Sequence, residues 1–248
     1  MMLLGLDISH TYFKGTPWRK NAIRNVSLGV DSSELLVIYG KNGSGKTTLA
    51  KILSGLLKPT RGEVLMCGRN IYEETKRCSG PSLRVGYVHQ KPEQHFFRNT
   101  VMDELTWGIR QGTAEYRKPY GYSLSETCTF LGLDLESIAG RSPFALSSSE
   151  QRKVALAGFF AKMPDILIFD EPFAYLSRED TKRVIGLIDN AREEGVAFVV
   201  VSHNMPDISR VANKVLILDR GKAVYYGPPE DSLKVLQSEE SFHKLQTT

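Results

Sequence analysis

The sequence predicts an α/β fold: a mixed, largely parallel sheet with an inserted helical subdomain. Three short runs rich in Leu, Ile and Val have the length and composition of buried strands, at residues 35–39, 166–169 and 197–201. Segments with loop and helix character separate them, and such alternation is typical of an α/β core. Polar residues follow all three runs. Because ligands of these sheets bind beyond the carboxyl ends of the strands, we expect the functional site there.

The composition is that of an ordinary globular protein. Of 248 residues, 41% are hydrophobic and 24% are charged, enough for one substantial core with a smaller lobe. The net charge of +4 arises from 32 basic and 28 acidic residues spread along the chain. Since no basic block stands out, we expect no nucleic-acid partner.

Cysteine usage and hydropathy indicate the compartment. Cys67, Cys78 and Cys128 are odd in number and lack CxxC spacing, which favours a reducing compartment without a disulfide framework or a zinc site. The apolar start of the chain meets Asp7 early, and no uncharged apolar stretch approaches the roughly 20 residues that cross a bilayer. We therefore expect a soluble chain that contacts a membrane only through partners.

Helical spacing places the remaining elements. A helix is expected to begin at Lys46, because Leu49, Ile52, Leu53 and Leu56 follow at helical intervals, and Gly55 and Pro59 are expected to end it. The domain is expected to span residues 1–228, with an inserted helical subdomain at about 92–160 that includes helices near 101–109 and 125–131. A C-terminal helical tail is expected at 229–248.

Residues 40–47 carry the most specific motif in the chain. They match GxxxxGK[ST], in which glycines let backbone N–H groups turn toward phosphates, Lys46 reaches the β and γ oxygens, and Thr47 ligates Mg²⁺. A chance match is the alternative, but a strand precedes the motif and a helix follows it. The motif predicts a P-loop NTPase with a RecA-like core and ATP and Mg²⁺ as cofactors. The expected nucleotide contacts here are Gly40, Asn42, Gly43, Ser44, Gly45, Lys46, Thr47 and Thr48.

The other two strands end in residues suited to hydrolysis. Asp170 is placed to hold Mg²⁺, and Glu171 to orient and deprotonate a water molecule. His203 follows the last strand and is a candidate for a hydrogen bond to the γ-phosphate. A structural histidine is the alternative there.

The order of these motifs resembles the nucleotide-binding subunits of ATP-binding-cassette transporters over residues 4–228. The phosphate loop, Gln90, the segment Leu-Ser-Ser-Ser-Glu at 146–150, Asp170-Glu171-Pro172 and His203 fall where that family has its Walker A, Q-loop, signature, Walker B and H-loop. The resemblance implies that Gln90 serves catalysis and Mg²⁺ binding. It also implies that Tyr12 stacks on adenine, with neighbouring Phe13 or simple core packing as the alternatives.

Residues 90–108 resemble more narrowly the Q-loop region of energy-coupling-factor transporters, which import vitamins and transition-metal ions. That pattern runs approximately QNPExQxFxxTVxxExxFG, and His95 departs from it. The resemblance implies a transmembrane coupling subunit, a substrate-binding membrane subunit, and a peripheral place at the cytoplasmic face of the cell membrane. The alternatives are another type of ABC importer and a non-transport dimerisation module.

The family pairs two cassettes head to tail, so one chain's signature acts on the other's nucleotide. Ser147, Ser149 and Glu150 are therefore expected at the partner's ATP. Ser148 and Ser149 replace the family's two glycines, and Ser177 stands where the D-loop normally has aspartate. We hypothesise a heterodimer with a second ABC ATPase, in which the site receiving this signature is weak. The alternative is that serines are tolerated and both sites work.

Overall fold

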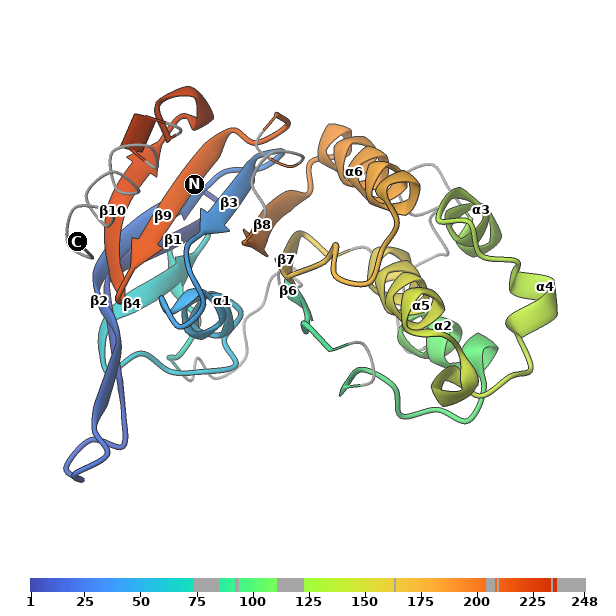
Figure 1. Cartoon of the computed structure of the whole chain (residues 1–248), viewed down its shortest axis with the longest axis horizontal. Helices are drawn as coiled ribbons and strands as arrows, with labels where there is room; N and C mark the ends of the chain where they lie inside the picture. The colour runs from blue at the N-terminus through green and yellow to red at the C-terminus, as the bar shows by residue number, and fades with distance from the viewer. Residues whose placement is uncertain are drawn as a thin grey trace, which may run out of the picture. The chain divides into compact units, whose positions relative to one another are not determined.

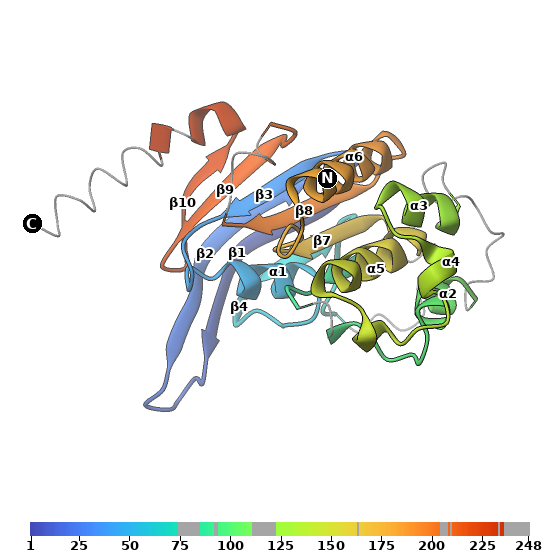
Figure 2. The same ribbon diagram turned by 45° about the vertical axis from the view of Figure 1, so that its right-hand side comes forward.

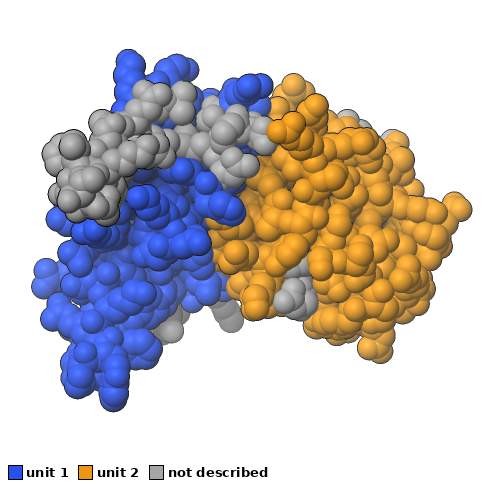
Figure 3. Space-filling model, viewed as in Figure 1, with its two compact units in different colours: residues 1–80, 197–248 blue, residues 81–196 orange. Residues whose placement is uncertain are grey.

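The computed structural model describes residues 1–73, 85–91, 94–110, 123–162, 164–203, 208, 210–232 and 234–235. The chain forms two compact units, coloured separately in Figure 3. The first contains residues 1–80 and 197–248, and the second contains residues 81–196.

The first unit contains an antiparallel sheet with strand order β2-β1-β4-β5. Its strands are β1 (Leu3–Tyr12), β2 (Lys20–Val30), β4 (Arg61–Met66) and β5 (Arg69–Asn70). Leu3 on β1 lies opposite both Val30 on β2 and Met66 on β4. Buried and partly exposed positions alternate along much of β1, as expected for a sheet with one covered face. The β1–β2 hairpin projects from this unit (Figure 2).

Four strands of a mixed sheet lie in the same unit, and two of them are predicted strands. β3 (Leu35–Tyr39) pairs in parallel with β8 (Ala197–Ser202) and with β9 (Lys214–Asp219), and β10 (Lys222–Gly227) pairs antiparallel with β9. Every residue of β8 is buried, and only the last residue of β3 is partly exposed. Such continuous burial explains why these strands appear in the sequence as unbroken apolar runs.

The helix after β3 begins at Lys46, as predicted, and ends just before Gly55. α1 (Lys46–Leu53) contacts β8 and buries Leu49, Ile52 and Leu53. Leu56 lies beyond the end of α1 and is 59% exposed, although it continues the helical spacing in the sequence. Gly55 has a φ of +81°, which ends the helix and turns the next residues away from its apolar face.

The second unit contains the third predicted strand and the remaining helices. β6 (Val85–Val88) pairs in parallel with β7 (Ile166–Asp170), and every residue of β7 is buried. α5 packs against α2 and α3 (Figures 1 and 2). The helices are α2 (Val101–Arg110), α3 (Leu124–Phe130), α4 (Leu135–Ile138), the 3₁₀ turn η3 (Pro143–Ala145), α5 (Ser148–Ala161) and α6 (Arg178–Glu193). The helices expected near 101–109 and 125–131 are confirmed as α2 and α3.

The domain boundaries at about 92–160 and 228 stay predictions, and most of the expected tail, 233 and 236–248, lies outside the described residues. Cys78 lies outside them too, whereas Cys67 is exposed and Cys128 is buried. Burial raises the pKa of the Cys128 thiol to about 11. Among the helices that the structure describes, none is long and apolar enough to span a bilayer.

Candidate functional site

The predicted site residues are divided between the two units. Tyr12, the loop at 40–48 and His203 belong to the first unit, and Gln90, residues 147–150 and Asp170 with Glu171 belong to the second. The first unit therefore contains the predicted phosphate and adenine contacts, and the second contains the predicted Walker B, Q-loop and signature residues.

The loop between β3 and α1 needs glycine for conformational and steric reasons. Gly43 and Gly45 have φ values of +80° and +108°, in the left-handed region. A Cβ on Gly45 would also lie 2.5 Å from the carbonyl oxygen of Ala22, and one on Gly40 would lie 2.3 Å from that of Leu218. The turn therefore leaves no room for a side chain at Gly40 or Gly45.

This loop wraps around the ammonium group of Lys46. The Lys46 Nζ donates to the carbonyl oxygens of Gly40 and Lys41 at 2.7 and 3.1 Å, and the side chain is buried. Gly45 is the N-cap of α1, so the first N–H groups of the helix and a positive side chain lie together. The Ser44 hydroxyl is buried and has no hydrogen-bond partner among the described residues. A cationic, donor-rich loop of this kind fits a phosphate group.

Tyr12 is held at the end of β1 beside α1. Its hydroxyl is 3.3 Å from the Thr48 hydroxyl, and its ring packs edge-on against His10, with centroids 4.6 Å apart. Burial lowers the pKa of His10. Phe13, the alternative adenine contact, is 67% exposed. Tyr12 is thus the more firmly positioned of the two aromatic rings.

Three other predicted contacts of this unit are exposed. They are Asn42 in the loop, Thr47 on the first turn of α1, and His203 immediately after β8.

Asp170 and Glu171 lie at the carboxyl end of β7, in the second unit. The Tyr87 hydroxyl donates to Asp170 Oδ2 at 3.0 Å, whereas Asp170 Oδ1 is buried without a hydrogen-bond partner in the part of the chain that the structure describes. An orphaned carboxylate oxygen is costly unless a cation binds it, so this carboxylate fits Mg²⁺.

Glu171 is buried and has a φ of 53°, a left-handed conformation that is strained for glutamate. Such strain persists where surrounding structure holds a functional residue in place.

The backbone of the Q-loop is held from two directions. Arg152 on α5 donates one guanidinium N–H to the carbonyl oxygen of His89 at 2.7 Å and another to that of Gln90. The His89 N–H donates to His95 Nε2 at 2.8 Å. Arg152 was not among the residues predicted from the sequence. The sequence does contain one signal for it. Arg152 shares a helix face with Leu156, four positions later, so a charged residue is expected on an apolar, buried face.

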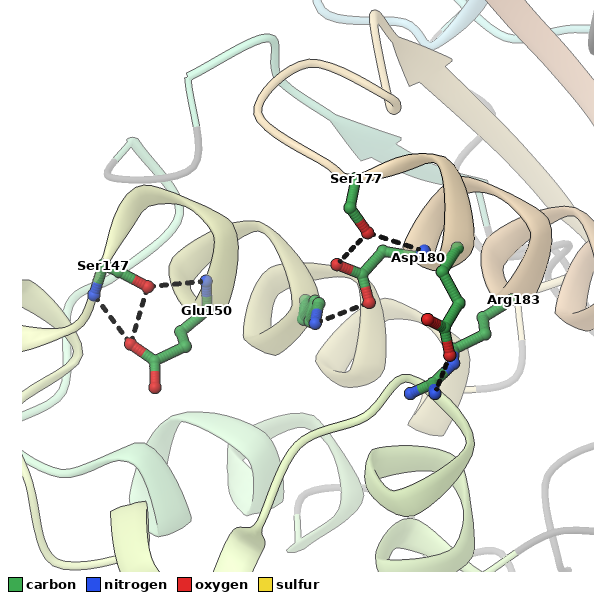
Figure 4. A network of polar contacts seen from close by, with 7 residues as sticks. Ser147, Glu150, Ser177, Asp180 and Arg183 are labelled. Atoms are coloured by element: carbon green, nitrogen blue, oxygen red, sulfur yellow. Dashed lines mark hydrogen bonds and ion pairs between the residues drawn. The ribbon is translucent and has the colours of Figure 1, made fainter.

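The signature forms the start of α5 (Figure 4). The Ser147 hydroxyl accepts from the Glu150 N–H at 3.3 Å, and Glu150 Oε2 accepts from the Ser147 N–H at 2.8 Å, which makes a capping box. The Ser147 hydroxyl also donates to Glu150 Oε2 at 2.7 Å. These bonds lower the pKa of Glu150. Ser148 and Ser149 occupy the first helical turn and do not have positive φ. Serine therefore fits the backbone conformation at these two positions without strain, because it adopts helical dihedrals readily. Their steric effect on a phosphate stays a prediction.

Ser177 also caps a helix. Its hydroxyl accepts from the Asp180 N–H at 3.0 Å and donates to Asp180 Oδ2 at 2.9 Å, at the start of α6. The residue that replaces the D-loop aspartate thus keeps the capping role that aspartate can also fill.

Comparison with known proteins defines the class. The family model described as "ABC transporter" matches residues 23–174. A dimeric ATP-binding cassette in a post-hydrolysis state with ADP and phosphate superimposes with a TM-score of 0.78 at 23% identity, covering 92% of this chain and 99% of the other. The cbiO1 protein of Clostridium perfringens gives 0.71 at 22% identity, covering 99% and 94%. The chain is an ATP-hydrolysing cassette of the ABC transporter family.

Curated relatives narrow the class. The chain is 35% identical over 224 residues to the energy-coupling factor transporter ATP-binding protein EcfA2 of Thermotoga maritima, covering 90% of this chain and 81% of the relative. It is 36% identical over 233 residues to EcfA of Methanosarcina acetivorans, covering 93% and 81%. It belongs with them to the ATP-binding subunits of energy-coupling factor transporters, which confirms the α/β P-loop fold, the ATPase activity and the subfamily predicted from the Q-loop region.

Proposed function

We propose that this chain hydrolyses ATP with its own Walker residues. Lys46 binds the β and γ oxygens, and Tyr12 stacks on adenine. Thr47, Gln90 and Asp170 would hold Mg²⁺, and the ion would supply positive charge against the charge that develops on the phosphates. Glu171 takes a proton from the attacking water, and His203 donates to the γ-phosphate. The observation that carries the proposal is the glycine loop wrapped around the buried Lys46 ammonium at the start of α1.

Titration calorimetry with ATP, with and without Mg²⁺, tests the metal role. Lys46→Ala should weaken binding in both conditions, because a phosphate ligand is lost. Asp170→Asn should remove only the gain from Mg²⁺. Asp165→Asn, just before β7, is the matched control and should behave like the wild type. An Asp170→Asn variant with the full Mg²⁺ gain would contradict the assignment.

We also propose that the chain works at the cytoplasmic face of a cell membrane with a transmembrane coupling subunit and a substrate-binding membrane subunit that takes a vitamin or a transition-metal ion. Two relatives support this assembly: EcfA2 of Thermotoga maritima is an energy-coupling factor transporter protein, and cbiO1 is part of the transporter complex cbiONQ.

A rigid aromatic cluster in the second unit offers a docking point for such a partner. The Trp107 ring contacts that of Phe97 edge-on, with centroids 5.7 Å apart, and the Arg98 guanidinium lies 3.2 Å from the Trp107 ring centroid. Glu104 accepts from the backbone N–H groups of Phe97 and Arg98, both at 3.0 Å. The Phe97 side chain is 57% exposed on this cluster, so it is available to an apolar partner.

Phe97→Asp should abolish co-purification with membrane subunits while ATP affinity stays unchanged. Trp18→Asp is the matched control, since Trp18 is 77% exposed on the β1–β2 hairpin of the other unit. Equal recovery of membrane subunits with both variants would contradict this docking face. Identification of the co-purified substrate-binding subunit would name the cargo.

We further propose a heterodimer with a second ABC ATPase in which the site receiving this chain's signature is the weaker one. Side chains at Ser148 and Ser149 add bulk where related cassettes have glycine. Glu171→Gln in this chain and the matching change in the partner test this asymmetry. The change in this chain should abolish most of the ATP turnover, and the change in the partner should reduce turnover only slightly. Equal loss from the two changes would contradict it.

A further inference from the structure

Two adjacent cationic residues on α5 reach different nucleotide-facing segments. Arg152 binds the backbone of the Q-loop, and Lys153 binds Asp180 on α6, just after the D-loop. The two residues follow Glu150, the last residue of the signature, by two and three positions. All three segments lie within the second unit.

The contact with the Q-loop is buried and directional. The Arg152 side chain is fully buried, and a buried guanidinium is costly unless its donors are used. Two of them bind the successive carbonyl oxygens of His89 and Gln90. On the other side of the same residue, His95 accepts from the His89 N–H. Burial, and then the charges of His89 and Arg152, lower the pKa of His95 to about 3, which keeps its Nε2 an acceptor.

The contact with the D-loop is a shielded ion pair (Figure 4). Lys153 Nζ lies 2.7 Å from Asp180 Oδ1, and the two side chains are only 11% and 16% exposed. The other oxygen, Asp180 Oδ2, accepts from the Ser177 hydroxyl at 2.9 Å. Lys153 therefore connects the signature helix, through one carboxylate, to the last residue of the D-loop.

We infer that Arg152 and Lys153 are positioning residues that hold the Q-loop and the D-loop on the signature helix, so that the three segments move as one body. The inference rests on the proposed function, which assigns Gln90 and the signature to the nucleotide. Neither residue is a catalytic group. They fix the positions of Gln90 and the D-loop during ATP hydrolysis.

A charge exchange tests the Lys153 contact in the full chain, purified with any subunits that accompany it. Lys153→Glu and Asp180→Lys should each lower kcat on the order of 10-fold, because small displacements at a reaction centre cost that much or more. The KM for ATP should stay close to that of the wild type, since Lys46 and Tyr12 are untouched. The double variant should recover most of the activity. The matched control is Glu179→Lys, which breaks the exposed Glu179–Arg183 pair and should leave kcat within about two-fold.

Arg152 and His95 are tested by the same assay. Arg152→Lys keeps a cationic donor and should retain more activity than Arg152→Met. His95→Gln keeps an acceptor and should outperform His95→Leu. Thermal unfolding of each variant shows whether it is folded. Hydrogen exchange gives a readout independent of hydrolysis, because Arg152→Met should speed exchange at residues 89–91, and Lys153→Glu at 172–177.

Unchanged kcat in both Lys153→Glu and Arg152→Met, or failure of the charge exchange to restore activity, would overturn the inference. Unchanged exchange in both segments would overturn it too. Absence of ATP hydrolysis by the unaltered chain would instead overturn the proposed function, and the exchange measurement would still decide the inference.

Discussion

At the residue scale, two constraints fix glycine at position 45. Its φ of +108° is unfavourable for any L side chain, and a Cβ would meet the Ala22 carbonyl oxygen at 2.5 Å. Gly43 in the same loop has a φ of +80°, but a Cβ added there would meet nothing within 4 Å among the described residues. A substitution at Gly43 would therefore meet backbone strain alone, whereas one at Gly45 would meet backbone strain and a steric clash.

Gly43→Ala should therefore lower the free energy of unfolding by only about 1–2 kcal/mol, the cost of a left-handed residue. Gly45→Ala should cost clearly more and should also weaken ATP binding, because the loop must move to relieve the contact. Urea unfolding and nucleotide titration of both variants measure this. Equal effects from the two substitutions would contradict a steric role for Gly45.

His95 makes stability depend on pH. Its folded pKa of about 3 lies below the ordinary value of 6.5, so the unfolded state binds its proton first as pH falls. Stability from neutral His95 is thus complete above about pH 6.5 and is lost as pH drops toward 3, by up to about 2 kcal/mol at pH 5. His95→Gln should lose less stability than the wild type between pH 7.5 and pH 5. Urea unfolding at both pH values measures these losses of stability. An equal loss in His95→Gln and in the wild type would contradict the assignment.

The sequence predicts the residues of the phosphate loop well because the motif is local. Gly45 and Lys46 lie within one short segment whose spacing carries the chemistry. Arg152 and Tyr87 were missed because their partners, His89 and Asp170, are 63 and 83 positions away. The spacing of residues within a short segment cannot reveal contacts between segments so far apart in the sequence.

At the element scale, serine caps fix the starts of α5 and α6. Ser177→Ala should lower the free energy of unfolding by about 1 kcal/mol, since the first N–H groups of α6 lose an acceptor. Ser177→Asp should retain stability, because aspartate caps equally well. Ser142→Ala is the control, as Ser142 precedes η3 without a side-chain capping bond. Thermal unfolding measures all three, and a loss at Ser142 as large as that at Ser177 would contradict the capping role.

Strands that are buried on both faces can be predicted from the sequence, whereas the partly exposed strands of the antiparallel sheet cannot. β3, β7 and β8 are unbroken apolar runs, so periodicity and composition indicate them directly. The antiparallel sheet of β1, β2, β4 and β5 was not predicted, because its strands are partly exposed and β1 pairs with β4 about 50 positions further along the chain. The end of α1 near Gly55 is predictable too, because a glycine that follows a helical run is a local signal.

At the scale of the whole molecule, membership of the ABC transporter family follows from the order of several motifs along the chain. The Walker residues of this chain match the pattern that related cassettes use for hydrolysis. Its departures, at Ser148, Ser149 and Ser177, fall in segments that face a partner's nucleotide in that family. We therefore expect an intact site on this chain's own loop.

The most direct test is the rate of phosphate release from ATP by the purified chain with its partners, compared with that of the Glu171→Gln variant. We expect Glu171→Gln to bind ATP with unchanged affinity and to lose turnover on the order of 100-fold or more, since a general base contributes that much. Glu179→Gln, on the exposed face of α6, should turn over ATP like the wild type. Turnover by Glu171→Gln within a few-fold of the wild type would contradict the claim that this chain hydrolyses ATP on its own Walker residues.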